Sequence, residues 1–142
     1  MTPQRITLVT LGVADLVRAR AFYESWGWTP ARALEGVIFF QMNGAVLALF
    51  GLHDLAEDQG RADASLGTGA MTLAQNFRTE AEVDAAFANA LAAGAVSLKA
   101  PQKVFWGGYS GYFADPDGHV WELAMNPFWP LAEDGSLTLP EA

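Results

Sequence analysis

Cysteine is absent from this sequence of 142 residues, and histidine occurs only twice, as His53 and His119. The lack of cysteine excludes disulfide bonds, thiolate metal sites and cysteine nucleophiles. A histidine acts as a metal ligand only where other ligands converge on the same ion. Because His53 lies in an acidic stretch and strand alternation points His119 away from the side of Glu122, we expect surface or structural roles for both histidines.

Basic residues are also scarce. Eight Lys and Arg stand against 16 Asp and Glu, which gives a formal net charge of -8. An acidic surface repels phosphate backbones, and the sequence has no cluster of Lys or Arg that would counter this average. We therefore predict that nucleic acid is not a partner.

Long apolar runs are missing as well. No segment approaches the roughly 20 residues that span a bilayer, and the first residues lack the apolar stretch of a signal peptide. These absences predict a soluble, cytoplasmic protein with no membrane partner. Apolar residues are nevertheless plentiful, because 51% of the chain is hydrophobic, including five Trp, nine Phe and three Tyr. This is enough for the core of one domain, with aromatic rings left for a pocket.

The first half of the chain predicts one strand, one helix and three further strands. Residues 6–13 are rich in β-branched and apolar side chains, which is typical of a strand. Asp15 is a candidate helix N-cap, and Gly27 ends that helix. Asn43-Gly44 is a strong hairpin signal. The three later strands are predicted at residues 31–35, 37–42 and 45–50.

The second half repeats this order after a polar stretch, residues 53–68, that predicts a mobile linker. Residues 70–78 predict a strand, Thr79 and Glu82 match a capping box, and Gly94 ends the second helix. Three more strands are predicted at residues 96–100, 111–114 and 119–125.

The repeated order indicates an internal duplication of a βαβββ unit. We predict a single domain over residues 1–142, with modules at about residues 5–52 and 69–126 and a C-terminal strap at residues 127–142. Each helix can cover only one face of its small sheet. The predicted fold is therefore α+β, with tandem βαβββ modules that form a curved mixed sheet enclosing a cup. The alternative is an ordinary α+β sandwich without a cup.

Three stretches, residues 8–23, 74–84 and 111–123, carry a recognisable pattern. The third contains Asp-Pro-Asp-Gly at residues 115–118, with Glu122 four residues after the glycine. Together the stretches resemble the glyoxalase/bleomycin-resistance/dioxygenase superfamily, also called the vicinal oxygen chelate superfamily. That fold serves lyases, epimerases, oxygenases and pure binders, so the residues of the site must decide the function.

The resemblance also implies where a metal would bind. Metal-dependent members use a His or Gln from the first strand and a Glu from the last strand of each module. Carried over to this sequence, these positions are Leu8 and Ala48, then Gln75 and Glu122. Two of the four cannot bind a metal, and one amide with one carboxylate is a poor donor set. We therefore predict no metal and no cofactor.

Glu122 interrupts an apolar strand, and its family counterpart faces the cup. A carboxylate among aromatic side chains suits a general acid or base. Alternatively, Glu122 only hydrogen-bonds Gln75 or the backbone and closes off a vestigial site.

The Gly107-Gly108 pair is flanked by large aromatic residues: Trp106, Tyr109 and Tyr112. Flexible backbone beside flat rings suits a lid over an apolar ligand, although a simple hairpin turn would use the same glycines.

Two functions therefore stay open. The first is a metal-free cup that binds a small, partly aromatic organic molecule, in a chain that forms a homodimer as bleomycin-resistance-like binders do. The second is a glyoxalase-like lyase, isomerase or dioxygenase, either metal-dependent or with Glu122 as its catalytic residue. The residues predicted to contact the ligand are Gln75, Trp106, Tyr109, Tyr112 and Glu122.

Overall fold

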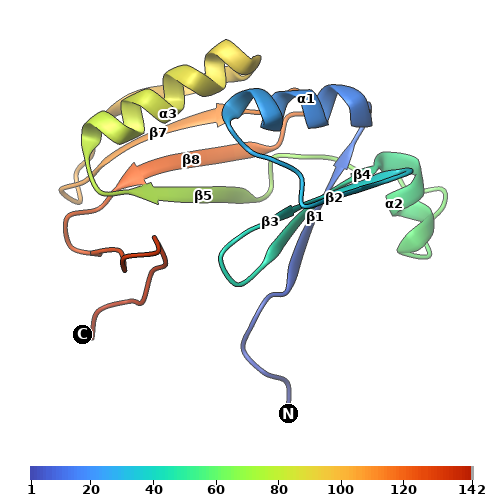
Figure 1. Cartoon of the computed structure of the whole chain (residues 1–142), viewed down its shortest axis with the longest axis horizontal. Coiled ribbons are helices and arrows are strands. Elements are labelled where there is room, and N and C mark those ends of the chain that lie inside the picture. Colours follow the sequence, from blue (N-terminus) through green and yellow to red (C-terminus); the bar gives the residue numbers. More distant parts are fainter. Residues whose placement is uncertain (142) are drawn as a thin grey trace. The chain divides into compact units, whose positions relative to one another are not determined.

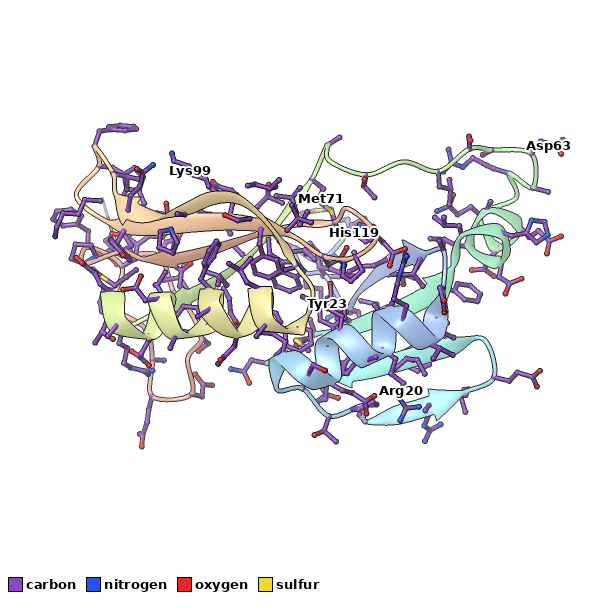
Figure 2. The ribbon with its side chains drawn as sticks, turned by 90° about the horizontal axis from the view of Figure 1, so that it is seen from above. Arg20, Tyr23, Asp63, Met71, Lys99 and His119 are labelled. Atoms are coloured by element: carbon purple, nitrogen blue, oxygen red, sulfur yellow. The ribbon has the colours of Figure 1, made fainter. Side chains whose placement is uncertain are left out.

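The computed structural model describes residues 1–141, and the chain forms two compact units (Figure 1). The first unit is Met1–Gly67, and the second begins at Thr68. Of the helices described, none has the length and apolar character needed to span a bilayer.

The first unit has a four-stranded mixed sheet and two helices. Its elements are β1 (Leu8–Val13), α1 (Leu16–Trp26), β2 (Arg32–Leu34), β3 (Val37–Gln41), β4 (Val46–Gly51) and α2 (Leu52–Asp58). The strand order is β1-β4-β3-β2, in which β1 runs parallel to β4 and the other neighbours are antiparallel.

The second unit repeats this arrangement. Its elements are β5 (Thr72–Phe77), α3 (Glu80–Ala93), β6 (Val96–Lys103), β7 (Tyr109–Ala114) and β8 (Val120–Met125). The order β5-β8-β7-β6, with β5 parallel to β8, matches that of the first sheet strand for strand. The predicted α+β fold with two βαβββ units is confirmed.

Both main helices begin and end where their caps were expected. The Asp15 side chain accepts a hydrogen bond from the Arg18 N–H, and Gly27 follows the last turn with a φ of 121°. In α3, the Thr79 hydroxyl accepts a hydrogen bond of 3.1 Å from the Glu82 N–H. Such caps satisfy backbone donors that a helix start would otherwise leave without partners.

The predicted linker at residues 53–68 is wrong in its first part, because α2 occupies Leu52–Asp58. Polar residues dominate this segment, yet Leu52 and Leu55 lie three residues apart and form an apolar stripe. The stripe packs against Gly12 of β1, where a Cβ atom would lie 2.8 Å from Leu52 Cδ2. The absence of a side chain at Gly12 therefore lets α2 pack closely against β1.

Each unit has its own core between its sheet and its main helix. In the first unit, the Tyr23 ring of α1 lies 6.0 Å from the Phe40 ring of β3, and both residues are buried. In the second, Val83 and Phe87 of α3 are buried, as are Phe113 of β7 and two residues of β8, Trp121 and Leu123. One face of each sheet is thus used for packing the helix, and the opposite face is available for a site.

Candidate functional site

The second sheet places Glu122 on the face opposite α3. The Tyr109 hydroxyl donates to Asp84 of α3 at 2.6 Å, so Tyr109 lies on the helix-covered face. Tyr109 is the register partner of Met125. Because side chains alternate along a strand, Glu122 points to the other face. We call this surface the Glu122 face; its other members include Tyr112 and Ala74, the register partners of Glu122 on β7 and β5.

A cavity of about 420 Å³ opens on the Glu122 face. It is lined by Asn76, Trp106, Glu122, Ala124, Asn126, Phe128 and Trp129. Three large rings thus share one hollow with one carboxylate and two amides. Apolar walls with a few polar groups are typical of small-molecule sites.

The Gly107-Gly108 turn lies close against two of these rings. A Cβ atom at Gly108 would overlap the Trp106 ring and lie 2.7 Å from the Met125 carbonyl oxygen. A Cβ atom at Gly107, whose φ is 96°, would lie 3.0 Å from the Phe128 ring. Only glycine allows Trp106 and Phe128 to approach the turn so closely.

The start of the C-terminal tail supplies the remaining aromatic wall. The Asn126 side-chain oxygen accepts a hydrogen bond of 2.9 Å from the Phe128 N–H, and the Asn126 carbonyl accepts one of 3.2 Å from the Trp129 N–H. Further along, the Arg78 guanidinium donates to the carbonyls of Ala132 and Glu133. The tail is therefore tied to the end of β8 and to the residue that follows β5.

Tyr112 and Glu122 form the polar centre of this face. Burial raises the pKa of the Tyr112 phenol, and the negative charge of Glu122 and a hydrogen bond to it raise that pKa further. The shift favours the protonated phenol, which is the form that can donate to the carboxylate.

Two of the residues predicted to contact a ligand lie elsewhere. Gln75 is the register partner of Leu123, so it points to the α3 side and does not border Glu122. Tyr109 also faces α3, where its hydrogen bond to Asp84 raises its pKa to about 12. The strand register does not place these two residues on the face of Glu122, because Gln75 is one residue from Ala74 and Tyr109 is three residues from Tyr112, the register partners of Glu122.

Five residues of the cavity were not predicted from the sequence as ligand contacts: Asn76, Ala124, Asn126, Phe128 and Trp129. Asn76 directly follows Gln75, so a shift of one position along the strand would have identified it. The Asn126-Pro127-Phe128 sequence carried a second signal, because Asn before Pro favours a turn.

The histidines lie outside this cavity. His53 is on α2, with its Nε2 atom 3.5 Å from Glu57 and most of its side chain exposed. The backbone N–H of His119 donates to Asp115 in the turn before β8.

The donor atoms do not fit a metal site of the kind that the family uses. Leu8 and Ala48 offer no donor, and Gln75 points away from the face that carries Glu122. Within residues 1–141, no group of three or more His, Cys, Asp and Glu side chains is arranged to hold a metal ion. A single carboxylate with neutral amides is a weak ligand set for a catalytic metal, and the metal-free site stays a prediction.

Comparisons with known proteins agree with this architecture. A glyoxalase-related enzyme from Fulvimarina pelagi is 42% identical, with a TM-score of 0.91 over 98% of this chain and 100% of that one. A lactoylglutathione lyase from Agrobacterium tumefaciens is 26% identical, with a TM-score of 0.69 over 92% of this chain and 100% of that one. Among curated proteins, none matches the chain.

A family model gives the same assignment from the sequence. The model of the Glyoxalase/Bleomycin resistance protein/Dioxygenase superfamily matches residues 5–123, which include the first βαβββ unit, most of the second and Glu122. The chain therefore belongs to the glyoxalase/bleomycin resistance protein/dioxygenase superfamily.

Proposed function

We propose that the cavity on the Glu122 face binds a small organic molecule that has an aromatic part and a cationic or hydrogen-bond-donating group. The observation that carries this proposal is the position of Glu122 in a hollow walled by Trp106, Phe128 and Trp129. Aromatic walls favour a flat ring, and rings of high electron density also attract cations. The carboxylate provides the acceptor, and the protein needs no metal for this function.

Tyr112 supports the same proposal. Its phenol donates to Glu122, which leaves the carboxylate with further lone pairs for a ligand. A donor on the ligand would form a charge-assisted hydrogen bond, which is about twice as strong as a neutral one.

The binding test uses two probes of similar shape and different charge. Benzylammonium and benzyl alcohol are titrated into the protein, with tryptophan fluorescence and calorimetry as readouts. We expect tighter binding of benzylammonium. Glu122→Gln should weaken it about tenfold or more, because a charge-assisted hydrogen bond contributes about 1.5–3 kcal/mol.

Glu35→Gln is the matched control, because Glu35 is exposed in the loop between β2 and β3. It removes the same charge from the whole chain and should leave both affinities unchanged. Equal binding of the two probes, or equal weakening by both substitutions, would contradict the proposal.

The hydrogen-bonded pair of Tyr112 and Glu122 favours a second candidate, an acid–base isomerase or lyase. In an isomerase, Glu122 would take a proton from one atom of the substrate and return it to a neighbouring atom. Because the similar protein from Agrobacterium tumefaciens is named a lactoylglutathione lyase, that activity is the first to assay. If the protein turns over the substrate without added metal, and Glu122→Gln abolishes this turnover, the result would favour this candidate over simple binding.

A homodimer and a cytoplasmic location complete the proposal. Sedimentation of the purified chain tests the first, and fractionation of cells that express it tests the second. A monomer at micromolar concentration would refute the dimer.

A further inference from the structure

A second cavity lies on the sheet of the first unit, on the face opposite α1. Its volume is about 380 Å³, and it is lined by Leu8, Ala31, Arg32, Phe39, Gln41 and Val46. Phe40 contacts Tyr23 of α1, so its neighbours Phe39 and Gln41 point to the other side of the sheet. We call this surface the Arg32 face.

The strand register places the lining side chains in two adjacent rows. Leu8, Val46 and Gln41 are successive partners across β1, β4 and β3. Arg32 of β2 is the partner of Phe39. The Arg32 side chain thus lies next to the Phe39 ring, at one end of the apolar lining of the cavity.

The Arg32 side chain has no ion-pair or hydrogen-bond partner among residues 1–141. The strands β1 to β4, which form this face, contain no Asp or Glu. An acidic side chain, Asp54 of α2, lies at the other end of the sheet beside Gly51. In a chain with a formal net charge of -8, Arg32 is thus a positive charge that forms no ion pair among the described residues.

The other polar side chain of the cavity is already engaged. The Gln41 amide nitrogen donates to the Met42 carbonyl at 2.9 Å and to the Ala45 carbonyl at 3.2 Å. Both of its hydrogen atoms are therefore used in the turn before β4. Among the lining side chains, Arg32 is the donor that remains for a ligand.

We propose that the cavity of the Arg32 face binds a small organic anion with a flat carboxylate and an apolar body. The planar guanidinium offers parallel N–H groups that match the two oxygens of a carboxylate. Phe39, Leu8 and Val46 would contact the apolar body of the ligand. All residues of this site belong to the first unit, so the proposal rests on observations other than those that support the function proposed for the Glu122 face.

The test uses benzoate and its neutral analogue benzamide. Binding is followed by chemical-shift changes of backbone amides, which report where each probe binds. We expect benzoate to shift the amides of residues 31–41 and to bind more tightly than benzamide. Arg32→Gln should weaken benzoate about three- to tenfold and leave benzamide unchanged, since the partly exposed site reduces the gain from the charge. Arg32→Lys should retain part of the preference, because an ammonium keeps the charge and loses the planar fork.

Arg18→Gln is the control, because Arg18 is an exposed residue of α1 and lies outside the lining of this cavity. It should leave benzoate binding unchanged, and thermal melting of each variant checks that the fold is kept. Equal affinity for benzoate and benzamide, or unchanged benzoate binding in Arg32→Gln, would overturn the proposal. If Arg32→Gln instead self-associates and binds benzoate unchanged, the role of Arg32 is to prevent the edge strand β2 from pairing with another molecule. That result would also overturn the proposal. Weak binding of the probes on the Glu122 face would not contradict this proposal, so the two proposals can be refuted separately.

Discussion

The two units share one topology and differ in the charge that each presents on the sheet face opposite its main helix. The first carries Arg32 beside Phe39, and the second carries Glu122 beside Trp106. Strand order and pairing are the same in both units. The duplicated framework therefore fixes where side chains emerge, and the residues at single positions on that framework decide which charge each face presents.

The units also differ in what surrounds each face. In the first, α2 packs against Gly12 at one end of the Arg32 face. In the second, the Trp106 turn and residues 126–129 build walls around Glu122. Large-to-small substitutions, removal of helix caps and changes of pH test whether the two units also differ in stability.

The largest effect is expected from the two core rings, Phe40 and Phe113. Both side chains are buried, with exposures of 1% and 0%. Replacing either by Ala should cost about 3–5 kcal/mol of unfolding free energy, because it leaves a cavity in a close-packed core. Urea titration measures the loss, and hydrogen exchange shows which unit opens. A cost below about 1 kcal/mol for one of them would show that its unit is loosely packed.

Gly108→Ala is expected to have the next largest effect. The added methyl group would collide with the Trp106 ring and the Met125 carbonyl oxygen, at an expected cost of about 1–3 kcal/mol. It should also weaken binding of benzylammonium, because Trp106 must move. The matched change is Gly44→Ala in a hairpin of the first unit, where φ is 72° and no atom lies within 4 Å of the new Cβ. There we expect only the backbone cost of about 1 kcal/mol. Equal costs for the two variants would mean that Trp106 adapts.

Removing a helix cap should cost about 1 kcal/mol in either unit. Asp15→Ala removes the cap of α1 and Thr79→Ala that of α3. The measurement is again the unfolding free energy in urea, with Asp15→Asn and Thr79→Ser as controls that keep a capping oxygen. A loss that the controls share would mean that the cap is not the cause.

The smallest effect concerns alkaline pH and the two shifted tyrosines of the second unit. The pKa of Tyr109 is raised to about 12 and that of Tyr112 is raised from 10.0, so the folded state keeps protons that the unfolded state releases. This contribution to stability is complete below pH 10 and is lost as pH rises through the folded pKa values. Tyr109→Phe and Tyr112→Phe should each flatten the fall in melting temperature above pH 10. An unchanged slope in both variants would contradict the assigned pKa shifts.

The sequence was sufficient to predict the repeated order of elements, because capping residues and turn glycines mark them locally. Asp15, Gly27, Thr79 and Gly94 all lie at the predicted helix ends. It also indicated Glu122 and Trp106 as candidate site residues, and both line one cavity in the structure.

The errors arose where long-range pairing decides the outcome. Gln75 was aligned with Leu8 through the spacing of the helix ends, whereas the pairing of β5 with β8 places Asn76 on the face of Glu122. A shift of one residue reverses the face of a strand, and no local signal fixes the register. The helix α2 was missed for a related reason, since its stability comes from packing on Gly12 and not from its own composition.

The irregular pairing of β6 has a consequence for the behaviour of the protein at high concentration. This strand lies at the edge of its sheet, and Val96 and Leu98 are 59% and 53% exposed. Its pairing with β7 is interrupted between Ser97 and Lys99 and again between Lys99 and Gln102. Pro101 lies within the second interruption and offers no N–H group. Because bulges and a proline disfavour pairing along an edge strand, we expect the exposed apolar residues of β6 not to promote edge-to-edge association.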